Sequence, residues 1–100
     1  MSNTSTTFRT QGQFFAYLYQ MDDNEKWWAF IDRWMKEAKM YDLEGMRLGQ
    51  GIYNSLGGVE FGGKEASDAV LATPYDPFHQ DWRLIMFGKR VHEVWIELND

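Results

Sequence analysis

The chain has 100 residues, which is enough for one domain and too few for a second core. Apolar residues make up 44% of it and aromatic residues 17%, so a packed interior rather than global disorder is expected. There is no cysteine, which excludes disulfides, thiolate metal sites and cysteine nucleophiles. The formal net charge is −5 with acids and bases interspersed, a balance that disfavours non-specific binding to nucleic acid.

The first residues are polar and rich in Ser and Thr. They have neither the basic start nor the apolar core of a signal peptide, and no apolar run in the chain approaches the ~20 residues of a membrane span. The expectation is a soluble, cytoplasmic protein without membrane contact. Residues 1–9 are predicted to be a flexible tail, and residues 10–100 a single helical domain.

Two amphipathic helices are predicted in the first half of the chain. A short one starts at Gln11, because apolar side chains recur at helical spacing up to Tyr19. Residues 22–24, Asp-Asp-Asn, interrupt it and supply caps for the next helix, which is predicted over residues 23–40. That helix has one apolar arc, formed by Trp27, Phe30, Ile31, Trp34, Ala38 and Tyr41. Charged residues fill the opposite side, and Met40 is the one apolar residue predicted to lie among them.

The second half contains further helical patterns. Residues 46–56 predict a third helix that ends at the glycine pair 57–58, and residues 64–72 predict a fourth. The last segment, residues 81–98, fits either a helix or a hairpin that turns at residues 88–89. The helical stripe has fewer exceptions and contains Leu84, Phe87, Gly88, Val91, Val94, Trp95 and Leu98.

The predicted fold is therefore all-α, a compact bundle of four to five short helices around an aromatic-rich core. The alternative is an α+β fold that carries a C-terminal hairpin at residues 83–98.

The segment 73–83 contains both prolines of the chain. Four of its residues are expected to direct the chain into the last helix. Asp76 and Asp81 are predicted helix caps, Pro77 the first residue of a short helical turn, and Phe78 an anchor in the core. The two aspartates and His79 are also compatible with a metal site. Because capping accounts for both aspartates, neither a metal nor a cofactor is predicted.

Four short motifs follow one another along the chain: Arg-x-Gly-Gln, an aromatic-Asn pair, Thr-x-x-Asp-Pro-Phe and Asp-x-Arg. They fall on Arg47, Gly49 and Gln50; on Tyr53 and Asn54; on Thr73, Asp76, Pro77 and Phe78; and on Asp81 and Arg83. In this pattern the chain resembles a group of small helical proteins encoded by phages and prophages. The resemblance implies an all-helical fold and a phage or mobile-element setting, and it transfers no catalytic residues.

Six residues are candidates for contacting a partner: Trp28, Arg47, Gln50, Asn54, Trp82 and Arg83. Arg47, Gln50 and Asn54 share one side of the third predicted helix. Such a polar cluster fits a phosphate or a base edge, and it equally fits local bonds to loop backbone. Trp28 and Trp82 lie at the edges of their stripes, where they serve as interface hot spots or are covered by neighbouring helices.

No nucleophile or acid–base constellation is evident, so the predicted function is that of a non-enzymatic, phage-type accessory protein that binds a host macromolecule. A host protein is the preferred partner, and inhibition of a host defence or regulatory system is one form of this function. One alternative is a helix-turn-helix-like DNA-binding regulator, although the acidic balance makes nucleic acid an unfavourable partner. Another is a metal-dependent enzyme using Asp76 and Asp81. A monomer or small homo-oligomer is expected.

Overall fold

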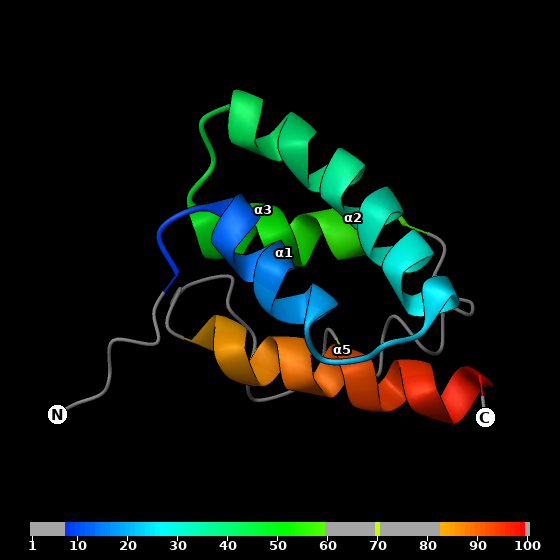
Figure 1. Cartoon of the computed structure of the whole chain (residues 1–100). Helices are drawn as coiled ribbons and strands as arrows, with labels where there is room; N and C mark the ends of the chain where they lie inside the picture. Colours follow the sequence, from blue (N-terminus) through cyan, green and yellow to red (C-terminus); the bar gives the residue numbers. More distant parts are fainter. Residues whose placement is uncertain (1–7, 60–69, 71–82, 100) are drawn as a thin grey trace, which may run out of the picture.

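The computed structural model describes residues 8–59, 70 and 83–99. Four helices build this part of the chain: α1 (Gln11–Tyr19), α2 (Glu25–Leu43), α3 (Leu48–Leu56) and α5 (Leu84–Asn99). In Figure 1, α1 lies between α2 and α5 and packs on both, while α3 packs against α2. No helix in these ranges is long and apolar enough to cross a membrane.

The predicted all-α class is confirmed. The last segment is one continuous helix, so the hairpin alternative is wrong. Most of the fourth predicted helix lies outside the described residues, apart from Val70, which is helical and buried.

Side-chain caps start the first two helices. The Thr10 hydroxyl accepts the N–H of Gln13 at 3.2 Å, and the Gln13 side chain in turn accepts the N–H of Arg9 at 2.7 Å. At the start of α2, Asn24 accepts the N–H of Lys26 at 2.8 Å. These bonds satisfy amides that have no partner within a helix, so both starts follow from the cap residues in the sequence.

The end of α2 differs from the prediction. The helix continues to Leu43, and Gly45 then takes a left-handed conformation with φ of 81°. The N–H of Gly45 donates to the Asp42 carbonyl at 3.0 Å, and the N–H of Met46 donates to the Tyr41 carbonyl at 3.2 Å. These two bonds form a Schellman motif, which closes a helix where glycine tolerates positive φ.

The helix α3 ends at Leu56, as predicted, but not through a left-handed glycine. Gly57 keeps a right-handed helical conformation with φ of −66°. Among the described residues, only Gly45 has a positive φ.

The core is a cluster of aromatic rings from α1, α2 and α5. Phe14, Phe15 and Trp34 meet edge to face, with ring centroids 5.2 to 5.6 Å apart. Phe87 of α5 joins Trp34 at 6.2 Å. Phe8, which the sequence places in the flexible tail, packs its ring 5.7 Å from that of Phe14. Edge-to-face pairs of this kind add stability beyond the area they bury.

The predicted apolar stripes match the buried surface with two corrections. In α2 the arc is buried up to Ala38, but Tyr41 is only half-buried. In α5 the stripe is buried from Leu84 to Trp95, whereas Leu98 in the last turn is 46% exposed. Both exceptions lie near helix ends, where the neighbouring helices give less cover.

Glycines let the helices approach closely at two points. A Cβ atom on Gly88 would lie 3.0 Å from Leu18 Cδ2, so a larger residue there would force the side chains of α1 that face it to shift. A Cβ atom on Gly51 would lie 3.3 Å from the Cβ of Tyr41, which brings α3 against the last turns of α2.

One buried polar side chain links α2 to α3. The Trp34 indole N–H donates to the Ser55 hydroxyl at 2.8 Å, and that hydroxyl donates to the Ile52 carbonyl at 2.8 Å. Both side chains are fully buried. The serine is tolerated in the core because its hydroxyl accepts a hydrogen bond from the indole and donates one to a backbone carbonyl.

We expect Ser55→Ala to lower the free energy of unfolding by about 1–3 kcal/mol, because a buried indole N–H would lose its acceptor. Urea denaturation followed by circular dichroism measures this. In a Trp34→Phe background, where no indole N–H remains, the same serine change should cost less. Equal costs in the two backgrounds would contradict this role of the hydrogen bond.

Candidate functional site

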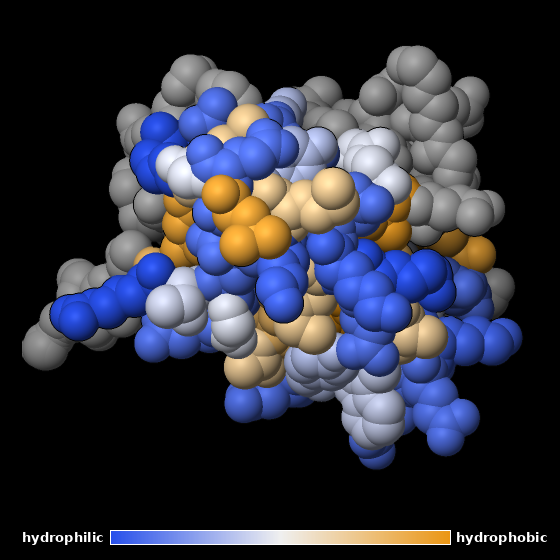
Figure 2. Space-filling model, turned by 90° about the horizontal axis from the view of Figure 1, so that it is seen from above, coloured by the Kyte–Doolittle hydropathy of each residue, from blue (hydrophilic) through white to orange (hydrophobic). Residues whose placement is uncertain are grey.

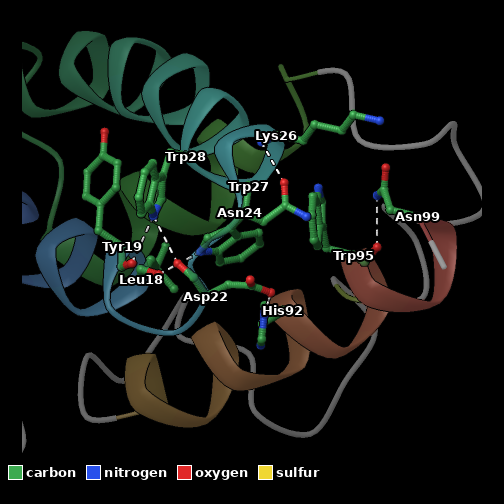
Figure 3. A network of polar contacts seen from close by, with 10 residues as sticks. All are labelled: Leu18, Tyr19, Asp22, Asn24, Lys26, Trp27, Trp28, His92, Trp95 and Asn99. Atoms are coloured by element: carbon green, nitrogen blue, oxygen red, sulfur yellow. Dashed lines mark hydrogen bonds and ion pairs between the residues drawn. The ribbon is translucent and has the colours of Figure 1, made fainter.

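Two consecutive tryptophans of α2 close the C-terminal end of α1 (Figure 3). The Trp27 indole N–H donates to the Leu18 carbonyl at 2.7 Å. The Trp28 indole N–H is shared between the carbonyls of Tyr19, at 3.1 Å, and Asp22, at 3.0 Å. The last carbonyls of a helix have no partner within it, so the indoles add donors to the carbonyls of Leu18, which also accepts the N–H of Met21 at 3.1 Å, and of Tyr19. Trp28 thus has a structural role, although it is 36% exposed rather than covered by other helices.

The same turn is tied to α5 by a titratable pair. His92 Nε2 lies 2.8 Å from Asp22 Oδ2, and both side chains are partly buried. The imidazole ring also lies 4.8 Å from the Trp27 ring and stacks on Trp95 at 6.5 Å. His92 and Asp22 therefore join two elements distant in sequence, and their hydrogen-bonding atoms face each other.

A third polar contact holds α1 against α2. The Tyr19 hydroxyl donates a hydrogen bond to the Asp32 carboxylate. Burial, this hydrogen bond and the charge of Asp32 raise the pKa of Tyr19 to about 12. Tyr19 is therefore neutral at physiological pH and serves as a donor to Asp32.

The three residues predicted to form a polar cluster on the third helix differ in their surroundings. Arg47 is the N-cap residue of α3, exposed, and makes no capping bond through its side chain. Gln50 and Asn54 are half-buried, and the Asn54 amide donates to the Met46 sulfur at 3.7 Å. The asparagine thus turns back to the start of its own helix. This local bond favours the structural interpretation of Asn54 over base or phosphate recognition.

Trp28 is separated from the start of α3. Trp28 lies fifteen residues before the end of α2 at Leu43, which is about 22 Å along a helix. Trp28 and the start of α3 therefore do not form one surface. Arg83 immediately precedes α5 and is half-buried.

Trp82 and the proposed caps and turn residues lie outside the described residues: Asp76, Pro77, Phe78 and Asp81. The metal alternative involving His79 lies there too. Within the described ranges, no three His, Asp or Glu side chains come close enough to hold a metal ion.

The structure reveals a pocket that the sequence did not indicate. It lies between the start of α1, the C-terminal half of α2 and the start of α3, and its volume is about 520 Å³. We call it the α1–α2 groove; its lining residues are Arg9, Thr10, Gln11, Gly12, Met35, Lys39, Asp42, Met46 and Leu48. The Gln11 side chain donates to the Ala38 carbonyl at 2.7 Å, which fixes the start of α1 against α2 beside this groove.

Next to the groove, the C-terminal half of α2 presents large apolar side chains to solvent. Met40 is 60% exposed and Leu43 is 78% exposed. Three exposed cations share this side of the helix, and we call the whole set the α2 outer face: Arg33, Lys36, Lys39, Met40 and Leu43. Figure 2 looks onto the molecule from the side of α2 and shows apolar surface enclosed by hydrophilic surface.

One signal in the sequence pointed to this face. Met40 is the residue that departs from the apolar arc of the second predicted helix. Leu43 was missed because the predicted helix ends at residue 40, whereas the real helix runs one turn further. That extra turn places Leu43 three residues after Met40 and on the same side of α2.

In comparisons with known proteins, no family model, curated protein or solved structure matches this chain. The resemblance to phage-encoded proteins therefore stays a prediction, and function is argued from the geometry.

We expect Trp28→Phe to lower the free energy of unfolding by about 0.5–1.5 kcal/mol, because the carbonyls of Tyr19 and Asp22 lose a shared donor. Urea denaturation measures the loss. Ile96→Ala, which shortens an exposed side chain of α5, is the control and should change stability by no more than about 0.5 kcal/mol. If Trp28→Phe leaves stability unchanged, the indole does not hold the α1–α2 turn.

Tyr19 also predicts a dependence on pH. Its pKa is raised from 10.0 to about 12, so its stabilising contribution is complete below pH 10 and is lost as pH rises towards 12. The stability of the wild type relative to Tyr19→Phe should therefore fall over that interval. Urea midpoints of both proteins at several alkaline pH values test this. Tyr17, whose pKa burial also raises, is present in both and cancels. A constant difference between the midpoints would contradict the assignment.

Proposed function

We propose that the chain is a small non-enzymatic protein that binds a partner protein through the α1–α2 groove and the α2 outer face. The observation that carries this proposal is the exposure of Met40 and Leu43 on the helix face that also includes Lys39, which lines the pocket. Fully burying one such side chain contributes about 1.5–3 kcal/mol, so covering both favours association. Apolar side chains grouped beside a hollow and enclosed by polar surface are typical of protein interaction sites.

The polar groups elsewhere support a binding role over a catalytic one. The His92–Asp22 pair joins the α1–α2 turn to α5, and Tyr19 binds Asp32 to hold α1 on α2. Arg90 and Glu93 pair along the exposed side of α5 at 3.4 Å. The two residues of each pair bind each other, and none of these six residues lines the α1–α2 groove.

In this proposal the setting is a phage or prophage and the partner a host protein, as the motif resemblance implies. Inhibition of a host defence or regulatory system is one specific form. These finer statements are supported by the sequence motifs, whereas the binding face is supported by the exposed apolar side chains.

The test is affinity capture from a host lysate with tagged wild type, Leu43→Asp and Leu98→Asp. The two changes put the same carboxylate on an exposed leucine of α2 or of α5. We expect a stoichiometric partner that wild type and Leu98→Asp retain, and that Leu43→Asp binds at least about tenfold more weakly, a loss of roughly 1.4 kcal/mol. Circular dichroism checks that both variants fold.

Two outcomes would contradict the proposal. Retention of the partner by Leu43→Asp together with its loss by Leu98→Asp would move the site to α5. Failure of the wild type to capture any stoichiometric partner would count against a protein-binding function.

A further inference from the structure

The α2 outer face is locally basic in a chain whose net charge is −5. Arg33, Lys36 and Lys39 are exposed on it, and Arg9 lies across the groove from α2. The described residues provide no ion pair to any of these four cations. Asp32, which helical spacing places on the same side of α2, is engaged by the Tyr19 hydroxyl. The Asp32 carboxylate keeps its charge while it accepts this hydrogen bond, but one acid is outnumbered by Arg33, Lys36 and Lys39, so this face carries a net positive charge.

Apolar and cationic groups are interleaved on this surface. Lys39 lines the groove and lies between Met35, which forms part of its wall, and Leu43, which is exposed beside it. The wall also includes Met46 and Leu48. Methionine side chains adapt to varied apolar shapes, so such a wall suits an inserted side chain more than a flat surface.

We propose that the α1–α2 groove and the α2 outer face dock an acidic peptide segment of the partner. A large apolar side chain of that segment enters the groove, and neighbouring carboxylates lie between Arg9 and Lys39. This inference rests on the proposed function, and it specifies the chemistry of the partner. Asp42, the acid that lines the groove, disfavours a second carboxylate beside it and so directs the peptide's charges towards the two cations.

Charge also argues against a second copy of this chain as the occupant. In a two-fold symmetric dimer the same face meets itself, so Arg33, Lys36 and Lys39 would oppose their own copies. Like charges brought together in an interface disfavour association. An acidic segment instead meets complementary charge.

The test is selection of displayed random peptides on the full-length protein. We expect enrichment of sequences with Asp or Glu close to Leu, Met, Phe or Trp. An enriched peptide, synthesised with a fluorophore, should bind Lys39→Glu at least tenfold more weakly than wild type, as measured by anisotropy. Lys89→Glu, which makes the same charge change at an exposed position of α5, should bind as wild type does.

A charge exchange sharpens the test. Replacing the peptide's acidic residues by lysine should abolish binding to wild type and restore it to Lys39→Glu, because the attraction is re-formed with reversed signs. A fold defect in Lys39→Glu would not be rescued by a change in the peptide. Leu43→Asp should also weaken binding of the original peptide.

Several results would overturn the inference: no enrichment, enrichment of basic or uncharged peptides, or equal loss of binding in Lys39→Glu and Lys89→Glu. A dimer that Leu43→Asp dissociates in sedimentation would assign the face to a second copy, and a DNA duplex bound through Lys39 would assign it to nucleic acid. A partner captured through Leu43 but insensitive to Lys39→Glu would leave the proposed function intact and refute only the acidic peptide. Absence of any Leu43-dependent ligand would refute both.

Discussion

Two adjacent indole N–H groups fix the geometry on which the rest of the molecule depends. Trp27 and Trp28 donate to carbonyls at the end of α1, so the end of one helix is bonded to the beginning of the next. The turn between them also presents Asp22 to His92, which draws α5 to the same place. One corner of the bundle thus sets how α1, α2 and α5 lie relative to one another.

The groove follows from this corner and from a difference in helix length. Nine residues make α1 about 14 Å long, whereas nineteen make α2 about 28 Å long. The two helices are joined at the tryptophan corner and α1 runs back along α2. The first residue of α1, Gln11, therefore lies beside Ala38, five residues short of the end of α2 at Leu43. The last turns of α2 therefore extend past the start of α1, which leaves room for the groove, while Met40 and Leu43 reach solvent on the side of α2 opposite its buried arc. Gly45 then turns the chain back so that the start of α3 completes the wall.

Much of the fold could be predicted because its helices carry regular apolar stripes with cap residues between them. Asn24 and the glycines at 57–58 mark boundaries that the structure confirms. The hydrogen bonds of Trp27 and Trp28 could not be predicted. Every residue has a backbone carbonyl, so the sequence does not indicate which one an indole binds. Nor could the groove be predicted, since its lining comes from three separate segments whose contact depends on helix lengths. An error of one turn at the end of α2 was enough to hide Leu43.

The contact between His92 and Asp22 joins residues 70 positions apart, whereas Trp27 and Leu18 are nine apart and Trp34 and Ser55 twenty-one apart. Closing a long loop costs more chain entropy than closing a short one, and non-local contacts slow folding. The first three helices can therefore associate through near neighbours before α5 arrives. We therefore expect α5 to dock late in folding, and its docking brings Phe87 onto Trp34 in the aromatic cluster. Until α5 docks, these rings are exposed to water in a chain that is still being synthesised. We therefore expect misassembly to be most favoured in the interval before α5 arrives.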